Sequence, residues 1–385
     1  METFDRPPNE VWLPPLRSPA RPAERDEPSV TYYDQPMIKP PHWKWYIPAY
    51  FWLGGIAGGA ATIGAAARLF GGPVAKRDTV RHARYLSLAL AIICPIFLIL
   101  DLGRPERFFR MFRVVKVSSP LSIGTWILSA FGLASGALAV RQAVEDSVVI
   151  PRESGLGRLL RRLIPDAPLS ALQGILGLGL GGYTGVLIAV TAIPLWAAGG
   201  IFLGPLFLAT ALASGAAALT LLSVAFGKRD PESERARGTV ETVEAISAAT
   251  QLALVGARDL TTPSRINQPL RVGFWGRVFR IGAVGGGMAT PLTLRIVARL
   301  LGPRATKVIS VIAAVLTLLG ALAERFTIVE AGKVSSRDPL AYQDLTAGAP
   351  GEARPTAREQ ALHAPQASAH RPRIAASDTA FDSIR

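Results

Sequence analysis

Eight long apolar stretches recur along the 385-residue chain, and each is bounded by Arg and Lys clusters or by Gly and Pro. They cover residues 48–70, 85–102, 121–140, 171–193, 199–226, 239–257, 279–298 and 307–328. An α-helix needs about twenty predominantly apolar residues to cross the hydrocarbon core of a bilayer. The pattern therefore predicts an all-α integral membrane protein with eight transmembrane helices and with both termini on the same side.

The composition and the distribution of charge support this class. Hydrophobic residues make up 49% of the chain, and the net charge of +14 is spread between the apolar stretches. A basic protein that binds nucleic acid carries its charge on one face of a domain, whereas charge between spans indicates contact with anionic lipid. We therefore expect the lipid bilayer as a partner and no nucleic acid. Arg and Lys crowd both sides of the predicted spans, so the positive-inside rule leaves the orientation open.

The two ends of the chain have a different composition. Residues 1–40 are rich in Pro and Arg, and residues 336–385 are rich in Ala, Pro and Arg. Segments of this kind bury too little apolar surface to fold, so we expect disordered tails on either side of a membrane domain of residues 41–335. The N-terminal segment has no short apolar core and no small-residue cleavage site, so it does not have the pattern of a signal peptide.

Metal ligands are scarce in the sequence. Cys94 is the single cysteine, and the four histidines all lie away from the middle of the apolar stretches. This set cannot hold an iron–sulfur cluster, a zinc finger or an intramembrane haem. We expect no metal site in this chain, so a redox centre of that kind must come from a partner.

The stretch around Asp101 places a carboxylate at the end of an apolar run, where Gly103, Arg104 and Pro105 follow it. An ionisable group at a membrane boundary is a candidate functional residue. The alternative is that Asp101 caps the helix and pairs with Arg104 or Arg107 among the lipid headgroups.

Alternating spans bring the start of the first, the end of the second, the start of the third and the end of the fourth to one membrane face. Polar and aromatic residues gather there: Trp43, Tyr50, Trp52, Asp101, Arg104, Ser122, Trp126, Trp196 and, somewhat deeper, Tyr183. Aromatic walls with a few polar groups suit a quinone, a flat apolar ligand with carbonyl oxygens. A Tyr hydroxyl can hydrogen-bond a quinone oxygen, and an acid can exchange its proton. Taken alone, each Trp is more often an interfacial anchor than part of a ligand site.

From this reasoning we assign catalytic roles to Asp101 and Tyr183. The candidate quinone-binding residues are Tyr50, Trp43, Arg104, Ser122 and Trp126.

The sixth stretch contains two carboxylates, Glu241 and Glu244, which share a helical face because they are three residues apart. A buried or surface amphipathic helix is the alternative to a span. If the helix crosses the membrane, this face should point into the bundle, where Arg295 and Glu324 of later spans can join it in a proton path. Packing ion pairs or contact with headgroups are the other interpretations of these four residues.

Several segments together resemble the NrfD/PsrC family of polysulfide-reductase-type membrane subunits. They are residues 43–46, 54–59, 101–108, 119–126 and 183–187, with the last closing at 194–196. The resemblance covers about residues 30–335, and residues 32–41 are similar to members associated with formate dehydrogenases.

The resemblance implies two four-helix bundles, a quinone-site bundle at residues 48–196 and a second bundle at 199–330. It also implies a multi-pass protein of the bacterial plasma (inner) membrane. Such a subunit has no bound cofactor and exchanges electrons between menaquinone or ubiquinone and a ferredoxin-like iron–sulfur subunit attached to a molybdopterin-dependent catalytic subunit. The quinone is expected on the face where that partner docks.

The resemblance assigns Tyr183 to the position of a quinone-contacting Tyr. Tyr50 falls where some members carry His, and Ile47 falls where some carry Asn, so part of the family's quinone site is not reproduced.

Two other functions remain open from the sequence. A secondary transporter is marked by broken helices and midplane charges, for which Pro291 with Arg295 and the Glu241/Glu244 pair are candidates. A membrane anchor without quinone chemistry is the third interpretation.

Overall fold

The computed structural model describes residues 38–113, 115–227, 230–298 and 303–346 of the chain, and these are helical with no strand among them. Most of the predicted N-terminal tail and residues 347–385 lie outside the described residues.

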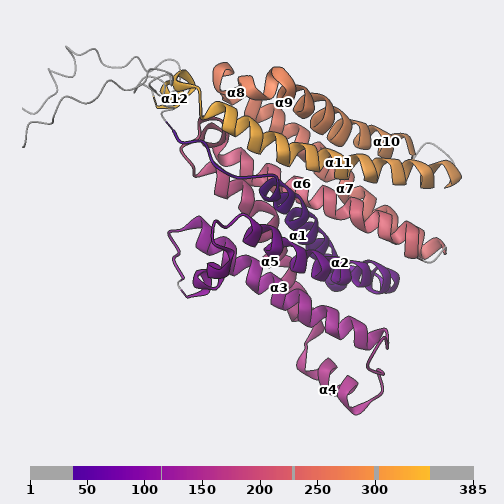
Figure 1. Ribbon diagram of the computed structural model, residues 1–385. Coiled ribbons are helices and arrows are strands. Elements are labelled where there is room, and N and C mark those ends of the chain that lie inside the picture. The colour runs from indigo at the N-terminus through magenta and orange to yellow at the C-terminus, as the bar shows by residue number, and fades with distance from the viewer. Residues whose placement is uncertain (1–37, 114, 228–229, 299–302, 347–385) are drawn as a thin grey trace, which may run out of the picture. The chain divides into compact units, whose positions relative to one another are not determined.

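Six helices form the first part of the membrane domain (Figure 1). They are α1 (Tyr46–Phe70), α2 (Pro73–Leu100), the short 3₁₀-helix η2 (Pro105–Phe112), α3 (Pro120–Glu145), the short α4 (Gly155–Leu163) and α5 (Asp166–Ala189). Pro73 and Pro120 start their helices, where the fixed φ of proline suits the first turn and its missing N–H costs nothing.

The second part starts with α6 (Pro194–Phe226) and α7 (Pro231–Thr261). It continues through α8 (Ser264–Arg271), α9 (Gly273–Arg277), the π-helix η3 (Val278–Ala289), α10 (Thr290–Ala298), α11 (Pro303–Ser335) and α12 (Pro339–Thr346). Helix α9, η3 and α10 follow one another without a break and together make one long helical segment.

Seven helical segments of the described chain are long and apolar enough to cross a membrane. They are α1, α2, α3, α5, α6, the segment α9–η3–α10, and α11. Seven of the predicted stretches fall on these segments. The remaining stretch, 239–257, lies in α7, which is long but begins with charged residues such as Glu232, Glu234 and Arg237. The prediction of an eighth span is therefore not confirmed by length and composition.

Helix α2 begins well before the predicted apolar stretch. Its first turns contain Arg77, Arg81 and Arg84, which lie before the predicted stretch of 85–102. The predicted start of this helix at residue 85 was wrong, because apolar composition marks the part of a helix that crosses the membrane and not the residue at which the helix begins. These arginines are held on the helix by Asp78, Asp146 and Asp166.

The two predicted four-helix bundles are not separate in the structure. Helix α6 packs against α1 and α5 as well as against α7 and α11. A Cβ at Gly58 would lie 2.5 Å from the Gly177 carbonyl oxygen of α5, and a Cβ at Gly59 would collide with the Ala211 carbonyl of α6. These glycines let three backbones approach closely, so residues 48–196 and 199–330 form one continuous helical assembly.

The described part of the predicted C-terminal tail, residues 336–346, is folded onto the other helices. Helix α11 runs to Ser335, and α12 follows with Ala341 buried and with contacts to α6 and α8. The prediction of disorder from residue 336 was wrong for the described part. A short helix whose stability comes from docking gives no signal in composition.

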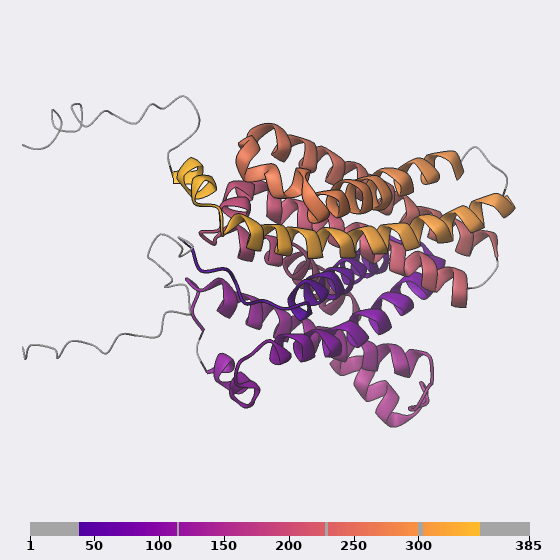
Figure 2. The same ribbon diagram turned by 45° about the horizontal axis from the view of Figure 1, so that its top comes forward.

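The described helices have two ends, which we call the terminal end and the distal end. The terminal end holds the segment before α1 together with η2, α8 and α12, and the distal end holds the α1–α2 turn, α4 and the last turns of α6 and α10 (Figure 2).

Candidate functional site

A groove of about 350 Å³ lies between α3 and α5, near the start of α3. It is lined by Val117, Ser118, Pro120, Ile123, Ile127, Leu178, Gly179, Gly182, Tyr183 and Val186. The two glycines expose the backbone of α5 at the bottom of the groove, and branched aliphatic side chains of α3 and α5 form its two walls. Its size and apolar lining are typical of a small-molecule site.

Tyr183 supplies the hydroxyl of this groove. It donates a hydrogen bond to the Pro120 carbonyl oxygen at 2.6 Å, and its ring occupies the space that a Cβ at Gly124 would need. The first turn of α3 is thereby docked on α5. The Tyr183 hydroxyl has a single proton to donate, so it can exchange this backbone acceptor for a ligand oxygen.

Tyr50 lies in the core. It is 3% exposed and packs beside Gly54 and Phe51. Tyr50 does not line the groove itself.

Trp43 packs elsewhere. Its ring stacks on Trp196 with the centroids 5.4 Å apart and meets Phe51 edge-on at 6.0 Å. Trp196 is 1% exposed and donates its indole N–H to the Ile328 carbonyl oxygen at 2.8 Å. These contacts tie the segment before α1 to α6 and α11, so Trp196 is a core residue and not an interfacial anchor.

Ser122 and Trp126 lie on the outer part of α3. The Ser122 hydroxyl accepts the Lys116 backbone N–H at 3.0 Å, and Trp126 meets Phe112 of η2 edge-on at 6.3 Å. Both residues hold the η2 connection against α3, and neither lines the groove.

Asp101 is the half-buried residue that follows the last turn of α2. Its Oδ1 accepts the Lys44 backbone N–H at 3.5 Å, which links α2 to the segment before α1. Arg104 is exposed at the start of η2 and forms no ion pair within the described residues. The alternative interpretation, in which Asp101 pairs with Arg104 or Arg107, is not found among the described residues, and no hydrogen bond joins Asp101 to Tyr183.

The predicted proton-path residues do come together in part. Arg295 of α10 lies 2.5 Å from Glu244 Oε2 and 3.1 Å from Glu241 Oε1, both on α7. Thr317 of α11 donates to Glu244 Oε1 at 2.7 Å. Glu244 is 1% exposed, so a charged cluster of three helices is buried here.

Glu324 belongs to a second buried cluster. Its Oε2 accepts the Thr210 hydroxyl at 2.6 Å, and its Oε1 lies 3.6 Å from Arg325 Nη1. Arg325 donates to the Phe207 carbonyl oxygen at 2.8 Å and stacks its guanidinium 3.5 Å from the centre of the Phe207 ring. Gln251 Oε1 of α7 lies 3.1 Å from the Thr210 hydroxyl.

The two clusters lie on the same pair of helices. Gln251 follows Glu244 on α7, and Glu324 follows Thr317 on α11, in both cases by two helical turns or about 10 Å. Helices α7 and α11 therefore run in the same direction. Sequence reasoning missed both Thr210 and Arg325. For Arg325 a signal was visible, because residues 324–325 are a charged pair inside an apolar stretch.

Several buried polar atoms in and beside these clusters have no hydrogen-bond partner among the described residues. They are Arg258 Nε, Arg295 Nε and the atoms of two ion pairs that face each other without hydrogen-bond geometry, Arg295 Nη1 with Glu241 Oε1 and Arg325 Nη1 with Glu324 Oε1. Buried polar atoms are normally satisfied, so atoms of this kind mark places for water molecules.

Another ion cluster at the distal end was not predicted. Asp166 at the start of α5 pairs with Arg68 at 2.6 Å, with Arg141 at 3.7 Å and with Arg84, which also donates to Gln142 at 3.0 Å. It joins α1, α2, α3 and α5.

The part of the chain that the structure describes holds no group of three His, Cys, Asp or Glu side chains arranged to bind a metal.

Apolar helices of spanning length, packed through glycines around buried charged clusters, define a multi-pass helical membrane protein. The family model described as "Polysulphide reductase, NrfD" matches residues 35–335, and the chain belongs to this family. A comparison with curated proteins found no match.

Proposed function

We propose that this chain is the membrane subunit of a respiratory oxidoreductase in the bacterial plasma membrane, and that it exchanges electrons and protons between the quinone pool and a partner iron–sulfur subunit. The partner is attached to a molybdopterin-dependent enzyme. Membership of the NrfD family supports a quinone-interacting respiratory subunit, and the groove beside Tyr183 is the observation that carries the proposal in this chain.

The groove suits a quinone head group for three reasons. Ile127 and Leu178 supply apolar walls for a flat ring, and Gly179 leaves space between them. The Tyr183 hydroxyl is the donor for a quinone oxygen once it releases the Pro120 carbonyl. The exposed aliphatic side chains of α3 and α5 around the groove leave a path for an isoprenoid tail toward lipid.

Asp101 is the proposed proton acceptor for quinol oxidation. It is half-buried where α2 ends, and the absence of an ion pair with Arg104 among the described residues leaves its second oxygen free to take up a proton.

Blocking the groove tests this function. Gly179→Leu places a side chain against Ile127, where a Cβ has ordinary contact distances of 3.7 and 3.8 Å, so the helix should tolerate it. Gly136→Leu on α3 is the matched control, because a Cβ there meets nothing within 4 Å and the residue does not line the groove. In the purified complex, Gly179→Leu should raise the quinol KM about ten-fold or more, as expected for the loss of a fitted apolar contact.

Equal kinetics for the two glycine variants in intact complexes would exclude this groove as the quinone site. That result would favour the membrane anchor, in which the chain binds its partners without quinone chemistry.

The buried clusters support a proton path through the second half of the chain. Glu241, Glu244, Arg295 and Glu324 are ionisable groups in a region where a charge is costly, and such groups in membrane proteins mark ion or proton pathways. Glu324 Oε1 and Arg325 Nη1 form an ion pair at 3.6 Å but no hydrogen bond, so a water molecule beside them can complete their hydrogen bonds and extend the path. Packing ion pairs remain the competing explanation, and the Glu244 variant described below separates the two.

We also propose that α7 is the eighth membrane crossing. It meets α11 at two levels in the same order along both helices, at Glu244 with Thr317 and at Gln251 with the Thr210–Glu324 pair. Helices α7 and α11 run in the same direction, and one segment of spanning length, α9–η3–α10, lies between them in the chain. Because α11 is long and apolar enough to cross the membrane, we infer that α7 crosses the same membrane layer.

The terminal end is the proposed docking face for the iron–sulfur subunit. Helix η2 exposes Arg107, Arg110 and Arg113 together with Phe109 and Phe112. Arginine and aromatic side chains are enriched at protein interfaces, and a basic face attracts an acidic partner.

A secondary transporter is the second candidate, since two helical segments are interrupted. Helix α6 has non-helical dihedrals at Gly200, with φ 33° and ψ −117°, and η3 is a π-helix one turn before Arg295. Substrate uptake by the chain in vesicles without its partners would favour the transporter.

A further inference from the structure

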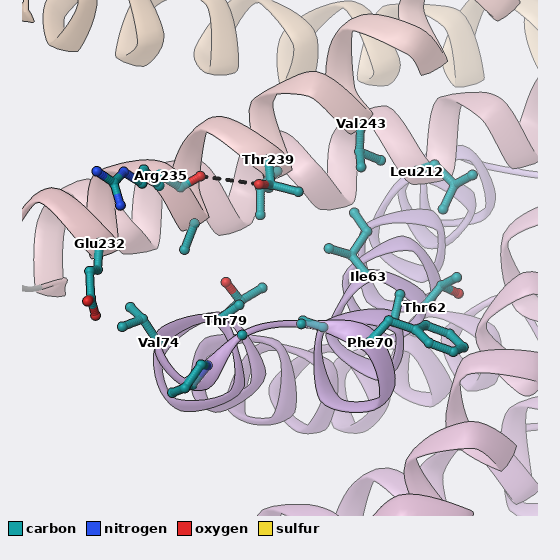
Figure 3. Close-up of a pocket in the computed structure, with 18 residues that line it drawn as sticks. Thr62, Ile63, Phe70, Val74, Thr79, Leu212, Glu232, Arg235, Thr239 and Val243 are labelled. Atoms are coloured by element: carbon teal, nitrogen blue, oxygen red, sulfur yellow. Dashed lines mark hydrogen bonds between the residues drawn. The ribbon is translucent and has the colours of Figure 1, made fainter.

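A second and larger cavity, of about 780 Å³, lies at the distal end between the α1–α2 hairpin and the first half of α7 (Figure 3). The end of α1, the turn at 71–73 and one face of α7 form most of its wall, and Leu212 of α6 closes one side. None of its lining residues belongs to the groove beside Tyr183 or to the buried ion clusters.

The wall contributed by α7 changes from charged to apolar along the helix. Glu232, Arg235, Thr239 and Val243 succeed one another on the face that meets the cavity, at the spacing of neighbours on a helix surface. Figure 3 shows Glu232 and Arg235 at one side of the cavity, with Ile63, Val243 and Leu212 at the other. A cavity with this gradient matches an amphiphile that has a charged head and an apolar tail.

The charged side carries two unused side chains of opposite sign. Arg235 and Glu232 are exposed, and neither forms an ion pair or a hydrogen bond through its side chain within the described residues. The nearby Arg77 is engaged by Asp78 at 2.8 Å. One cationic and one anionic group side by side fit a headgroup that also carries both charges.

Two of the three hydroxyls that line the cavity are already engaged. The Thr62 hydroxyl lies 2.9 Å from the Gly58 carbonyl oxygen and 3.1 Å from that of Gly174. The hydroxyl of Thr239 donates to the Arg235 carbonyl oxygen at 3.2 Å. Among the hydroxyls, a carbonyl ligand is therefore left with that of Thr79, whereas a zwitterionic headgroup meets both Arg235 and Glu232.

We propose that this cavity binds one zwitterionic glycerophospholipid of the phosphatidylethanolamine class. Arg235 pairs with the phosphate, Glu232 pairs with the ammonium group, and an acyl chain lies along Val243, Ile63 and Leu212. The lipid fills the space between α7 and the α1–α2 hairpin, where an empty cavity would lose dispersion contacts.

The test uses the full-length protein purified in detergent, washed free of lipid and then mixed with vesicles of phosphatidylethanolamine. Retained lipid is counted by native mass spectrometry. Arg235→Gln should lower retention at least about ten-fold, because a hydrogen bond to a charged group is lost. Ala66→Phe, which fills the cavity from α1, should lower retention as strongly without any change of charge.

Arg158→Gln is the matched control, because Arg158 is exposed on α4 at the same end and does not line the cavity. It should retain as much lipid as the unaltered chain. Vesicles of phosphatidylglycerol, which lack the ammonium group, should load less, and Glu232→Gln should remove that difference.

Three results would overturn the proposal: unchanged retention in both cavity variants, equal loading of the two lipids by the unaltered chain, or a quinone that co-purifies with the protein and is lost in Ala66→Phe.

Discussion

At the scale of single residues, Tyr183 matters because its hydroxyl holds the first turn of α3 and is also the proposed donor to a quinone oxygen. It holds the Pro120 carbonyl at 2.6 Å while its ring faces the groove between α3 and α5. The same atom can donate to a quinone oxygen only by leaving that carbonyl, so binding of quinone and the docking of α3 are linked.

Removing this hydroxyl gives the first prediction. Tyr183→Phe should raise the quinol KM about five-fold, since one neutral hydrogen bond contributes roughly 1 kcal/mol. Steady-state kinetics of the purified complex measures it, with Tyr46→Phe as the control because Tyr46 lies in α1 outside the groove. A loss of thermal stability with an unaltered KM would show that the hydroxyl only holds α3.

Asp101 gives the second prediction. Asp101→Asn keeps an oxygen for the Lys44 N–H, so the protein should fold and assemble, yet quinol-dependent turnover should fall about 10²-fold as for a lost general base. Arg104→Gln should leave turnover unchanged, because Arg104 forms no ion pair in the described part of the chain. Full turnover in Asp101→Asn would place proton transfer at another residue.

Which site residues the sequence can predict depends on how local their contacts are. A hydroxyl in a glycine-rich apolar helix identified Tyr183, and two glutamates three apart identified the buried face of α7. Proximity in sequence left an Asp101–Arg104 pair open as an alternative, but the backbone of Arg104 at φ −137° and ψ 84° departs from the helix, and the pair does not form among the described residues. The stacking of Trp43 on Trp196 joins residues far apart in sequence, which no local pattern reveals.

At the scale of elements, α7 contacts both the distal cavity and the two buried ion clusters. Its first turns face the proposed lipid cavity, its middle carries the Glu244 cluster, and Gln251 meets the Thr210–Glu324 pair. A helix that must present polar groups to the inside of a bundle is less apolar than its neighbours, which explains why hydropathy separates it from the other segments.

The ion cluster on α7 gives the third prediction. Glu244→Gln should lower the number of protons moved per electron pair while quinol oxidation continues, because Gln cannot carry a proton as Glu does. Thr317 can still donate to the amide oxygen, and Arg295 keeps Glu241 as its partner, so the fold should persist. Proton release from vesicles that contain the complex measures the ratio.

Glu234→Gln is the control for this experiment, since Glu234 lies on the same helix with its side chain 59% exposed. An unchanged proton ratio in Glu244→Gln, with or without lower stability, would identify the cluster as a packing ion pair.

Helix boundaries were harder to predict than helices. Apolar runs located seven of the long segments, because burial in lipid requires them. The basic start of α2 and the short α12 were missed, because both depend on ion pairs or docking with distant helices. The glycines at 58 and 59 lie where α1 approaches the backbones of α5 and α6 closely, a contact that depends on partners distant in sequence.

At the scale of the whole molecule, the two ends of the described helices differ in what they offer. The terminal end has the Tyr183 groove and the basic η2 helix, and the distal end has the proposed phospholipid cavity and the Asp166 cluster. We therefore propose that electron exchange with a docked subunit and contact with lipid headgroups take place at opposite ends.

Assembly gives the fourth prediction. Reversing the charge of Arg110 and Arg113 to Glu should weaken binding of the iron–sulfur subunit, because like charges then face an acidic partner. The same change at Arg158 and Arg162 of α4, at the distal end, should leave assembly intact. Co-purification over a range of salt concentrations measures both, and equal recovery of the partner in the two variants would count against the terminal end as the docking face.

The central claim is that quinone binds between α3 and α5, and photolabelling tests it most directly. A photoreactive quinone analogue, irradiated with the purified complex and mapped by peptide mass spectrometry, should label residues within 117–127 and 178–186, and excess unmodified quinone should suppress the labelling. Competed labelling confined to other segments, such as those that line the distal cavity at 62–79 and 232–243, would contradict the account.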